Sequence, residues 1–252
     1  MIEVHNLTFG YSATEDGQIL KGVDFAAKTG KLTALIGTNG AGKSTLLKTI
    51  MGILKGKGEI SVNGKPVSQY STKDFSSTVS YLSQDNDCKV NLSVFEVVML
   101  GRMGSMSFRV SDEDIAATQE VLERLNLQRF ASRSIMELSG GQRQLVFMAQ
   151  ALVKEPKILI LDEPTSALDL HKQFDLLTLL KNLTQENDFT TLVTLHHLDL
   201  AAMFADEIIV LKEGTVYAQG APKDIFTEAM MEDVYRVKTK IYIDDNGLPH
   251  VI

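Results

Sequence analysis

The first part of the chain begins with short segments in which apolar and polar residues alternate. Residues 2–9 and 19–25 show this alternation, which is typical of partly exposed antiparallel strands. Residues 31–36 then form a compact, mostly apolar run that leads into a glycine, and residues 44–51 place apolar side chains at helical spacing. A strand, a glycine-rich loop and a helix in this order predict a phosphate-binding unit.

The middle of the chain changes to a helical pattern. It extends from about residue 93 to residue 127, and its clearest helix begins near Ser111, which with Asp114 matches the acidic form of a capping box. The apolar face of this helix is expected at Ile115, Val121, Leu122 and Leu125. We interpret residues of roughly 91–137 as a helical insertion.

Helices and strands alternate again in the last part of the chain. Helices are predicted over residues 142–153 and 170–183, and apolar strands over residues 157–161 and 190–195, as in a sheet with both faces covered. The remaining signals are a hairpin at Glu213–Gly214, two short helical pieces and strands near Ile241 and Val251. These patterns predict an α/β fold with a mostly parallel sheet.

Composition and charge limit the classes of function. The chain has 252 residues, of which 44% are hydrophobic and 23% charged, so a single domain over residues 1–252 is expected. Its formal net charge of −7 argues against nucleic acid as a partner, because binding to phosphates normally needs a basic surface. No signal-peptide pattern is visible, and no apolar run approaches the about 20 residues that span a bilayer. We therefore expect a cytoplasmic protein, and any role at a membrane would need another chain to do the spanning.

The glycine-rich loop fits the pattern G-x-x-x-x-G-K-[ST] at every position. Its residues are Gly37, Thr38, Asn39, Gly40, Ala41, Gly42, Lys43, Ser44 and Thr45. Glycines let the backbone curl so that consecutive N–H groups can point at phosphate oxygens, and the following helix adds its positive N-terminal end. We expect Lys43 to supply a positive charge to the β- and γ-phosphates, and the hydroxyl of Ser44 to ligate Mg²⁺.

Two carboxylates follow the apolar strand of residues 157–161. In a parallel sheet, the C-terminal ends of the strands share an edge with the phosphate loop. Asp162 is therefore expected near the magnesium, and Glu163, one residue further on, could accept a proton from an attacking water. The alternative, that Asp162, Glu163 and Pro164 merely begin a loop, is weaker beside a phosphate loop.

A third motif points to a family. Residues 138–142 read Leu-Ser-Gly-Gly-Gln, which is identical to the signature of the ATP-binding cassette (ABC) ATPases, and the chain order of the three motifs also resembles that family. The signature residues Ser139, Gly140, Gly141 and Gln142 open a helix, where a hydroxyl and two glycine N–H groups make a second anion site. In the family this site caps the γ-phosphate bound by the opposite protomer. The resemblance implies a P-loop NTPase core with an N-terminal antiparallel β subdomain and an inserted helical subdomain, and hydrolysis of ATP with Mg²⁺.

Several further positions resemble functional residues of the family. Tyr11 resembles the aromatic residue that stacks on adenine, although a core or edge-strand tyrosine is a competing interpretation. Gln84 resembles the glutamine that reaches the metal and the attacking water, and Asp169 belongs to a segment that resembles the loop crossing the dimer interface. His196 resembles the switch histidine that contacts the γ-phosphate. The neighbouring His197 stands where relatives commonly have aspartate, and we assign the role to His196 because it directly follows the predicted strand.

The resemblance covers essentially the whole chain and extends to a subgroup. Residues 91–102 and 221–235 resemble importers of iron–siderophore complexes, haem or cobalamin. This implies an energy-coupling ATPase that forms a homodimer around two ATP molecules and docks on integral-membrane permease subunits at the inner face of the cell membrane, with a substrate-binding protein upstream. The alternative is a soluble single-cassette ABC ATPase that remodels a cytosolic assembly. A small-molecule kinase with a phosphate loop is a third interpretation, which the signature makes improbable.

Overall fold

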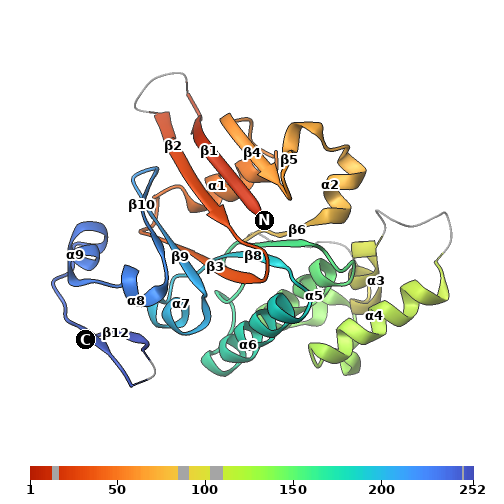
Figure 1. Cartoon of the computed structure of the whole chain (residues 1–252). Coiled ribbons are helices and arrows are strands. Elements are labelled where there is room, and N and C mark those ends of the chain that lie inside the picture. The colour runs from red at the N-terminus through yellow and green to blue at the C-terminus, as the bar shows by residue number, and fades with distance from the viewer. Residues whose placement is uncertain (13–16, 85–90, 103–109, 246) are drawn as a thin grey trace. The chain divides into compact units, whose positions relative to one another are not determined.

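The computed structural model describes residues 1–12, 17–84, 91–102, 110–245 and 247–252 (Figure 1). Its contacts group these residues into two compact units. The first unit contains Met1–Tyr70 and Phe174–Ile252, and the second contains Ser71–Gln173. The second unit includes the predicted helical insertion and extends beyond it on both sides, while the single domain over residues 1–252 stays a prediction.

The alternating N-terminal residues form an antiparallel sheet in the first unit, as predicted (Figure 1). Its strands are β1 (Ile2–Gly10), β2 (Gln18–Ala27), β4 (Lys57–Val62) and β5 (Lys65–Pro66), in the order β2-β1-β4-β5. Ile2 and Val4, which are two residues apart in β1 and so lie on one face of the strand, are both buried, so this face of the sheet packs inward.

Parallel strands form the core of the first unit. Strand β3 (Lys31–Ile36) lies between β8 (Thr190–Thr194) and β9 (Glu207–Lys212) and is parallel to both. Strand β10 (Thr215–Gly220) returns antiparallel to β9. The turn between them contains Glu213 and Gly214, both at positive φ, as the hairpin signal predicts.

The remaining elements of the first unit follow or connect these strands. They are α1 (Lys43–Ile50), η2 (Val67–Gln69), α7 (Leu198–Phe204), α8 (Pro222–Ile225), α9 (Glu228–Met230), η6 (Met231–Tyr235), β11 (Ile241–Ile243) and β12 (Pro249–Val251). Helix α6 (Leu170–Glu186) contains the boundary between the two units. The helix after the phosphate loop and the short tail elements agree with the sequence prediction.

The second unit is mainly helical. Its helices are α2 (Thr72–Thr78), α3 (Val94–Met99), η3 (Leu100–Arg102), α4 (Asp112–Arg124), η4 (Gln128–Phe130), η5 (Ile135–Glu137) and α5 (Gly140–Leu152). Two parallel strands, β6 (Val79–Leu82) and β7 (Ile158–Leu161), complete it. All residues of β7 are buried, which explains its unbroken apolar sequence.

Helix α4 confirms one prediction and corrects another. Ser111 and Asp114 form the predicted capping box at its N-terminus. Val121, Leu122 and Leu125 are buried, whereas Ile115 is 37% exposed, so its assignment to the apolar face is wrong. Asp114, beside it, is only 7% exposed, so a carboxylate takes the inward position in the first turn.

Candidate functional site

The phosphate loop joins β3 to α1 in the first unit. Gly37 has φ 147° and Gly42, the N-cap of α1, has φ 104°, a region that favours glycine. A Cβ atom on Gly37 would lie 2.2 Å from the carbonyl oxygen of Leu211 in β9. The glycines are therefore required both by the curl of the loop and by its close approach to the neighbouring strand.

The loop is anchored at its base and exposed at its tip. Lys43 is only 6% exposed, and its Nζ donates hydrogen bonds to the carbonyl oxygens of Gly37 (2.8 Å) and Thr38 (3.1 Å). The carbonyl of Ala41 accepts a hydrogen bond of 3.2 Å from the N–H of Gly214 in the β9–β10 turn. The tip residues are exposed, and they are Thr38, Asn39 and Gly40. Ser44 and Thr45, the second and third residues of α1, are half-buried.

The other candidates of the first unit lie at the ends of strands. His196 follows β8 after one intervening residue and is exposed, and His197 is the N-cap of α7 without a side-chain capping bond. Tyr11, just after β1, is 69% exposed and its ring meets that of Phe9 edge to face at 5.0 Å. The exposed ring rules out the interpretation of Tyr11 as a core residue.

In the second unit, Glu163 at the end of β7 contacts Gln84. Glu163 follows Asp162 directly after β7 and has φ 52°, a left-handed conformation that is strained for a side-chain-bearing residue. The side-chain amide of Gln84 donates a hydrogen bond of 2.8 Å from Nε2 to Oε2 of Glu163. The N–H and hydroxyl of Ser166 both donate to the carbonyl of Glu163, which fixes the turn. The structure therefore brings together two residues that lie far apart in the sequence.

Asp162 is buried at the same strand end. It is 1% exposed, and its N–H donates a hydrogen bond of 2.8 Å to the carbonyl of Leu82 at the end of β6. This bond continues the β6–β7 ladder by one residue. The strand pair thus holds Asp162 and the segment leading to Gln84 in a common register.

The signature residues form the N-terminus of α5. Ser139 is the N-cap: its Oγ accepts from the N–H of Gln142 (3.3 Å), and Oε1 of Gln142 accepts from the N–H of Ser139 (3.0 Å). Ser139 and Gly140 are exposed. A Cβ on Gly141 would lie 2.9 Å from the carbonyl oxygen of Ala167, so this glycine lets the signature pack closely against the segment before Asp169.

Asp169 caps the first turn of α6. Its Oδ1 accepts from the N–H of Lys172 at 3.0 Å, and its Oδ2 lies 3.0 Å from the ammonium of Lys172. The backbone N–H of Lys172 and then its side chain lower the pKa of Asp169. Asp169 is therefore a helix-capping carboxylate, and Gly141 links its loop to the signature.

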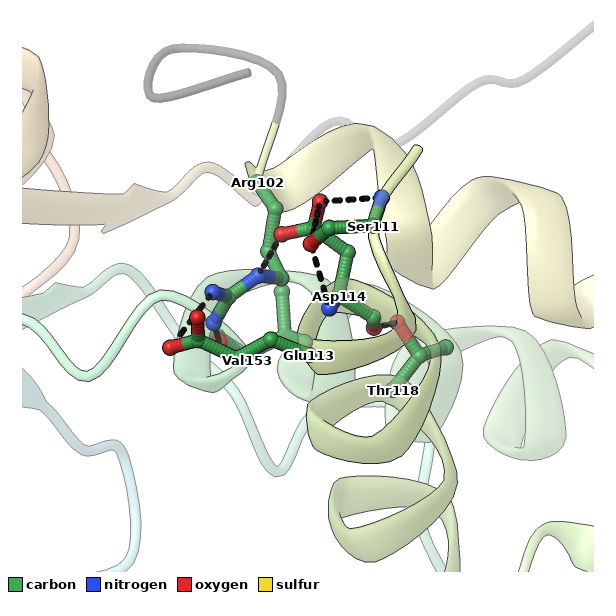
Figure 2. Close-up of polar contacts among 6 residues, drawn as sticks. All are labelled: Arg102, Ser111, Glu113, Asp114, Thr118 and Val153. Carbon is green, nitrogen blue, oxygen red and sulfur yellow. Dashed lines mark hydrogen bonds and ion pairs between the residues drawn. The ribbon is translucent and has the colours of Figure 1, made fainter. Parts of the chain in front are cut away.

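A cluster around Arg102 was not predicted from the sequence (Figure 2). Nε of Arg102 donates to Oδ1 of Asp114 at 2.6 Å, and Nη1 donates to the carbonyl of Val153 at 3.1 Å. Hydrogen bonds from Arg102, then from Ser111, lower the pKa of Asp114 to about 2. The capping box marked Ser111 and Asp114 in the sequence, but no local pattern identified Arg102 as their partner.

A groove of about 270 Å³ lies beside this cluster in the second unit. Its lining comes from β6, η3, α5 and the second residue after the end of α5: Ser80, Tyr81, Leu82, Leu100, Gly101, Phe147, Gln150, Ala151 and Lys154. Leu100 is 42% exposed. Lys154 donates from Nζ to the carbonyl of Val79 at 2.9 Å, and burial lowers its pKa.

The chemistry of these residues fits a nucleotide with magnesium. Mg²⁺ takes oxygen ligands, usually one or two protein groups together with phosphate oxygens and water. The hydroxyl of Ser44, the amide oxygen of Gln84 and the buried carboxylate of Asp162 are of this kind. Over the part of the chain that the structure describes, no cluster of three or more His, Cys, Asp or Glu side chains could hold a metal by itself.

Over the same described part, no helix has the length and apolar character needed to cross a membrane.

Comparison with known proteins identifies the family. The sequence model of the ABC transporter family matches residues 20–166, more than half of the chain. The chain is 37% identical over 246 residues to the iron(3+)-hydroxamate import ATP-binding protein FhuC of Bacillus subtilis strain 168, covering 96% of this chain and 90% of that protein.

Solved structures agree with this match. An ABC transporter described as of the metal-chelate type, in an inward-facing conformation, has a chain that is 29% identical, with a TM-score of 0.84 and coverage of 100% of this chain and 96% of that one. A dimeric ATP-binding cassette in a post-hydrolysis state with ADP and Pi is 30% identical, with a TM-score of 0.79 and coverage of 88% and 98%. These similarities do not support the soluble remodelling ATPase. The chain belongs to the ABC transporter family, as the ATP-hydrolysing subunit that couples energy to an importer.

Proposed function

We propose that this ATPase drives the import of a metal chelate: an iron–siderophore complex, haem or cobalamin. The subgroup resemblance of residues 91–102 supports this cargo class, as do the hydroxamate importer and the metal-chelate transporter to which the chain is similar. The proposed mechanism rests on the hydrogen bond between Gln84 and Glu163. Gln84 follows β6, a strand that lines the groove.

In the first unit, the phosphate loop binds the phosphates of ATP. The N–H groups of residues 37–45 and the positive end of α1 attract the anion, and the ammonium of Lys43 adds a full charge beside the loop carbonyls that hold it. The exposed ring of Tyr11 offers a face for stacking on adenine. His196 contacts the γ-phosphate.

In the second unit, Glu163 accepts a proton from the attacking water. The left-handed backbone and the hydrogen bond from Gln84 hold its carboxylate in one orientation, and a general base must be positioned in this way. Catalysis of phosphoryl transfer consists mainly of such positioning and of electrostatic stabilisation.

Magnesium is the cofactor that accompanies ATP. Ser44, Gln84 and Asp162 supply the protein oxygens that would hold it, and when bound it neutralises charge on the phosphates. Removal of divalent cations by a chelator is expected to abolish hydrolysis, and addition of Mg²⁺ is expected to restore it.

Two copies of the chain bind two ATP molecules head to tail. The exposed N-terminus of α5, with Ser139, Gly140, Gly141 and Gln142, presents backbone N–H groups and a hydroxyl to the γ-phosphate held by the other copy. The loop containing Asp169 crosses the same interface. The dimeric cassette to which the chain is similar supports this arrangement.

The groove between β6, η3 and α5 takes a segment of an integral-membrane permease subunit. Leu82 lines the groove, and its carbonyl accepts the hydrogen bond from Asp162. Two residues later, Gln84 contacts Glu163. A segment seated in the groove is therefore connected through a few covalent and hydrogen bonds to the catalytic carboxylate.

Affinity purification of the full chain from membranes tests this docking. The wild-type chain is expected to bring an integral-membrane permease with it, and Leu100→Arg, which places a charge at the groove, is expected to reduce the amount of permease. Ile115→Arg is the control, because Ile115 is similarly exposed on α4 and does not line the groove. Equal recovery of permease with Leu100→Arg would contradict docking in the groove.

Uptake measurements test the cargo. A strain lacking this protein is offered labelled ferric siderophore, haem and cobalamin, with a substrate-binding protein expected upstream. The control variant is Lys48→Ala, because Lys48 lies in the last turn of α1, away from the phosphate loop at its start. Loss of uptake of one cargo, restored by wild type and by Lys48→Ala but not by Lys43→Ala, would identify the substrate. Unchanged uptake of all three would overturn the cargo proposal and leave the ATPase in place. The protein is expected at the inner face of the cell membrane, bound through the permease.

A further inference from the structure

Arg102 joins three helical elements of the second unit (Figure 2). It is the last residue of η3, its Nε bonds Asp114 in the first turn of α4, and its Nη1 bonds the carbonyl of Val153, the C-cap of α5. We call Arg102, Asp114 and Val153 the Arg102 clasp. The planar guanidinium can hold two acceptors on different helices at once because its donors have fixed directions.

The clasp lies in partly desolvated surroundings. The side chain of Arg102 is 16% exposed and that of Asp114 is 10% exposed, whereas Glu113, 3.9 Å from the guanidinium, is 87% exposed. Ion pairs that are shielded from water and supported by further hydrogen bonds fix geometry more firmly than exposed pairs. Asp114 is also bonded by the N–H and hydroxyl of Ser111, so the carboxylate itself cannot turn away.

Close packing at the neighbouring residue reinforces the clasp. A Cβ on Gly101 would lie 2.2 Å from the carbonyl oxygen of Gln150 and 2.6 Å from Cγ1 of Val153. The backbone of η3 therefore lies directly on the last turn of α5. Gly101 and Gln150 also line the groove, and Val153 precedes the groove residue Lys154. One side of the groove is thus attached to the C-terminal end of α5 by both packing and charge.

Helix α5 connects this end to the signature. Its 13 residues begin at Gly140, immediately after Ser139, so the clasp and the signature lie at opposite ends of one rigid rod of about 20 Å. A displacement of η3 reaches Ser139 only if η3 is firmly attached to α5.

We propose that Arg102 is a positioning residue that transmits movement from the groove to the signature helix. This inference rests on the proposed docking of a permease in the groove. While the clasp is intact, η3, the start of α4 and α5 move as one body, so a partner that displaces η3 also displaces Ser139. Without the clasp, the groove keeps its lining residues and still binds the partner, but only the packing at Gly101 joins η3 to α5, so α5 follows the movement less closely.

The test compares ATP hydrolysis by the purified chain alone and by the chain in its detergent-purified complex with the permease. Arg102→Gln removes the charge from one side of the clasp, and Asp114→Asn removes it from the other. Arg102→Lys keeps the charge in case the first variant folds poorly. The matched control is Arg124→Gln, which breaks the exposed Arg124–Glu120 pair on the same helix α4.

We expect Arg102→Gln and Asp114→Asn each to reduce the permease-dependent change in ATPase rate by at least about fivefold, the scale of a typical coupling between sites. The double variant is expected to lose no more than Arg102→Gln alone, because Arg102→Gln already breaks the bond to Asp114. The chain alone is expected to keep its ATPase rate within about twofold, and Arg124→Gln to resemble wild type in both measurements.

Three outcomes would overturn the inference while the docking proposal stands. Normal permease dependence in Arg102→Gln would show that the clasp transmits nothing, and so would an additive loss in the double variant. If the ATPase rate of the chain alone fell as much as the rate of the permease complex, Arg102 would have only a general structural role. If the wild-type chain brings no integral-membrane protein with it, the docking proposal itself is wrong and the inference falls with it.

Discussion

The side-chain amide of Gln84 donates a hydrogen bond of 2.8 Å to the carboxylate of Glu163. Both residues lie just beyond the ends of neighbouring parallel strands, β6 and β7. The bond therefore connects Gln84, which follows a strand that lines the groove, to the carboxylate that we propose as the general base.

Substitution Glu163→Gln should slow ATP turnover by about 10²–10⁴-fold, because the amide cannot accept the proton of the attacking water. Binding of ATP and ATP-dependent dimerisation should remain. Phosphate release at saturating MgATP measures the first effect, and size-exclusion chromatography with ATP measures the second. Glu155→Gln is a matched control, since Glu155 also has a left-handed backbone, with φ 50°, and is exposed. Near-normal turnover in Glu163→Gln would refute the assignment of the base.

Substitution Gln84→Glu should place a second carboxylate at hydrogen-bonding distance from Glu163. Two like charges at this distance disfavour ionisation of both, so the pKa of the pair should rise. The acid limb of the pH–rate profile should move to higher pH by at least about one unit. Gln84→Leu removes the hydrogen bond without adding charge, so it should lower the rate without moving the profile. An unmoved profile in Gln84→Glu would show that the contact does not persist during turnover.

Substitution Gly37→Ala should disrupt the phosphate loop. At φ 147° the new Cβ would lie 2.2 Å from the carbonyl oxygen of Leu211, and a rigid strand cannot move aside easily. Gly64→Ala is the control, because Gly64 also has positive φ but its Cβ would meet nothing within 4 Å. Urea unfolding should show a loss of about 1 kcal/mol for Gly64→Ala. It should show a further loss of about 1–3 kcal/mol for Gly37→Ala. Equal losses would mean that the close approach to β9 does not matter.

The Arg102 clasp should contribute to the free energy of unfolding, and the size of this contribution should depend on pH in the acid range. The hydrogen bonds from Arg102 and Ser111 hold the folded pKa of Asp114 at about 2, below its ordinary value of 3.8. A carboxylate whose folded pKa is lowered contributes stability above its unfolded pKa, and this contribution is lost as the pH falls through the folded pKa. The stability difference between wild type and Asp114→Asn should therefore be constant above about pH 4 and shrink toward about pH 2.

Urea midpoints measured from pH 5 to pH 2 would show this change. Asp112→Asn, an exposed first-turn carboxylate of α4, is the control and should show a smaller dependence on pH. A difference between wild type and Asp114→Asn that stays constant through pH 2 would contradict the ionised clasp.

Local sequence was enough to predict the elements that contain the motifs. The phosphate loop, the apolar strand before Asp162 and the capped start of the signature helix were all predictable, because each depends on residues that are neighbours in the chain. The hydrophobic period predicted the strands and most helices for the same reason. The capping box of Ser111 and Asp114 is also local, since its bonds close within a single turn.

Contacts between residues that are distant in the sequence depend on tertiary packing. The contact of Gln84 with Glu163 depends on β6 pairing with β7 in one register, and the contact of Arg102 with Asp114 and Val153 depends on three helical elements packing together. No periodicity within a segment encodes such a meeting.

The same reason explains the error at Ile115. Its spacing placed it on the apolar face of α4, but at the first turn the inward position belongs to Asp114, which is held there by Arg102. The hydrophobic period reports which face of a helix is buried on average. Only packing between segments decides whether a charged pair is buried at a particular turn, because the cost of burying the carboxylate is offset by a partner from elsewhere in the chain.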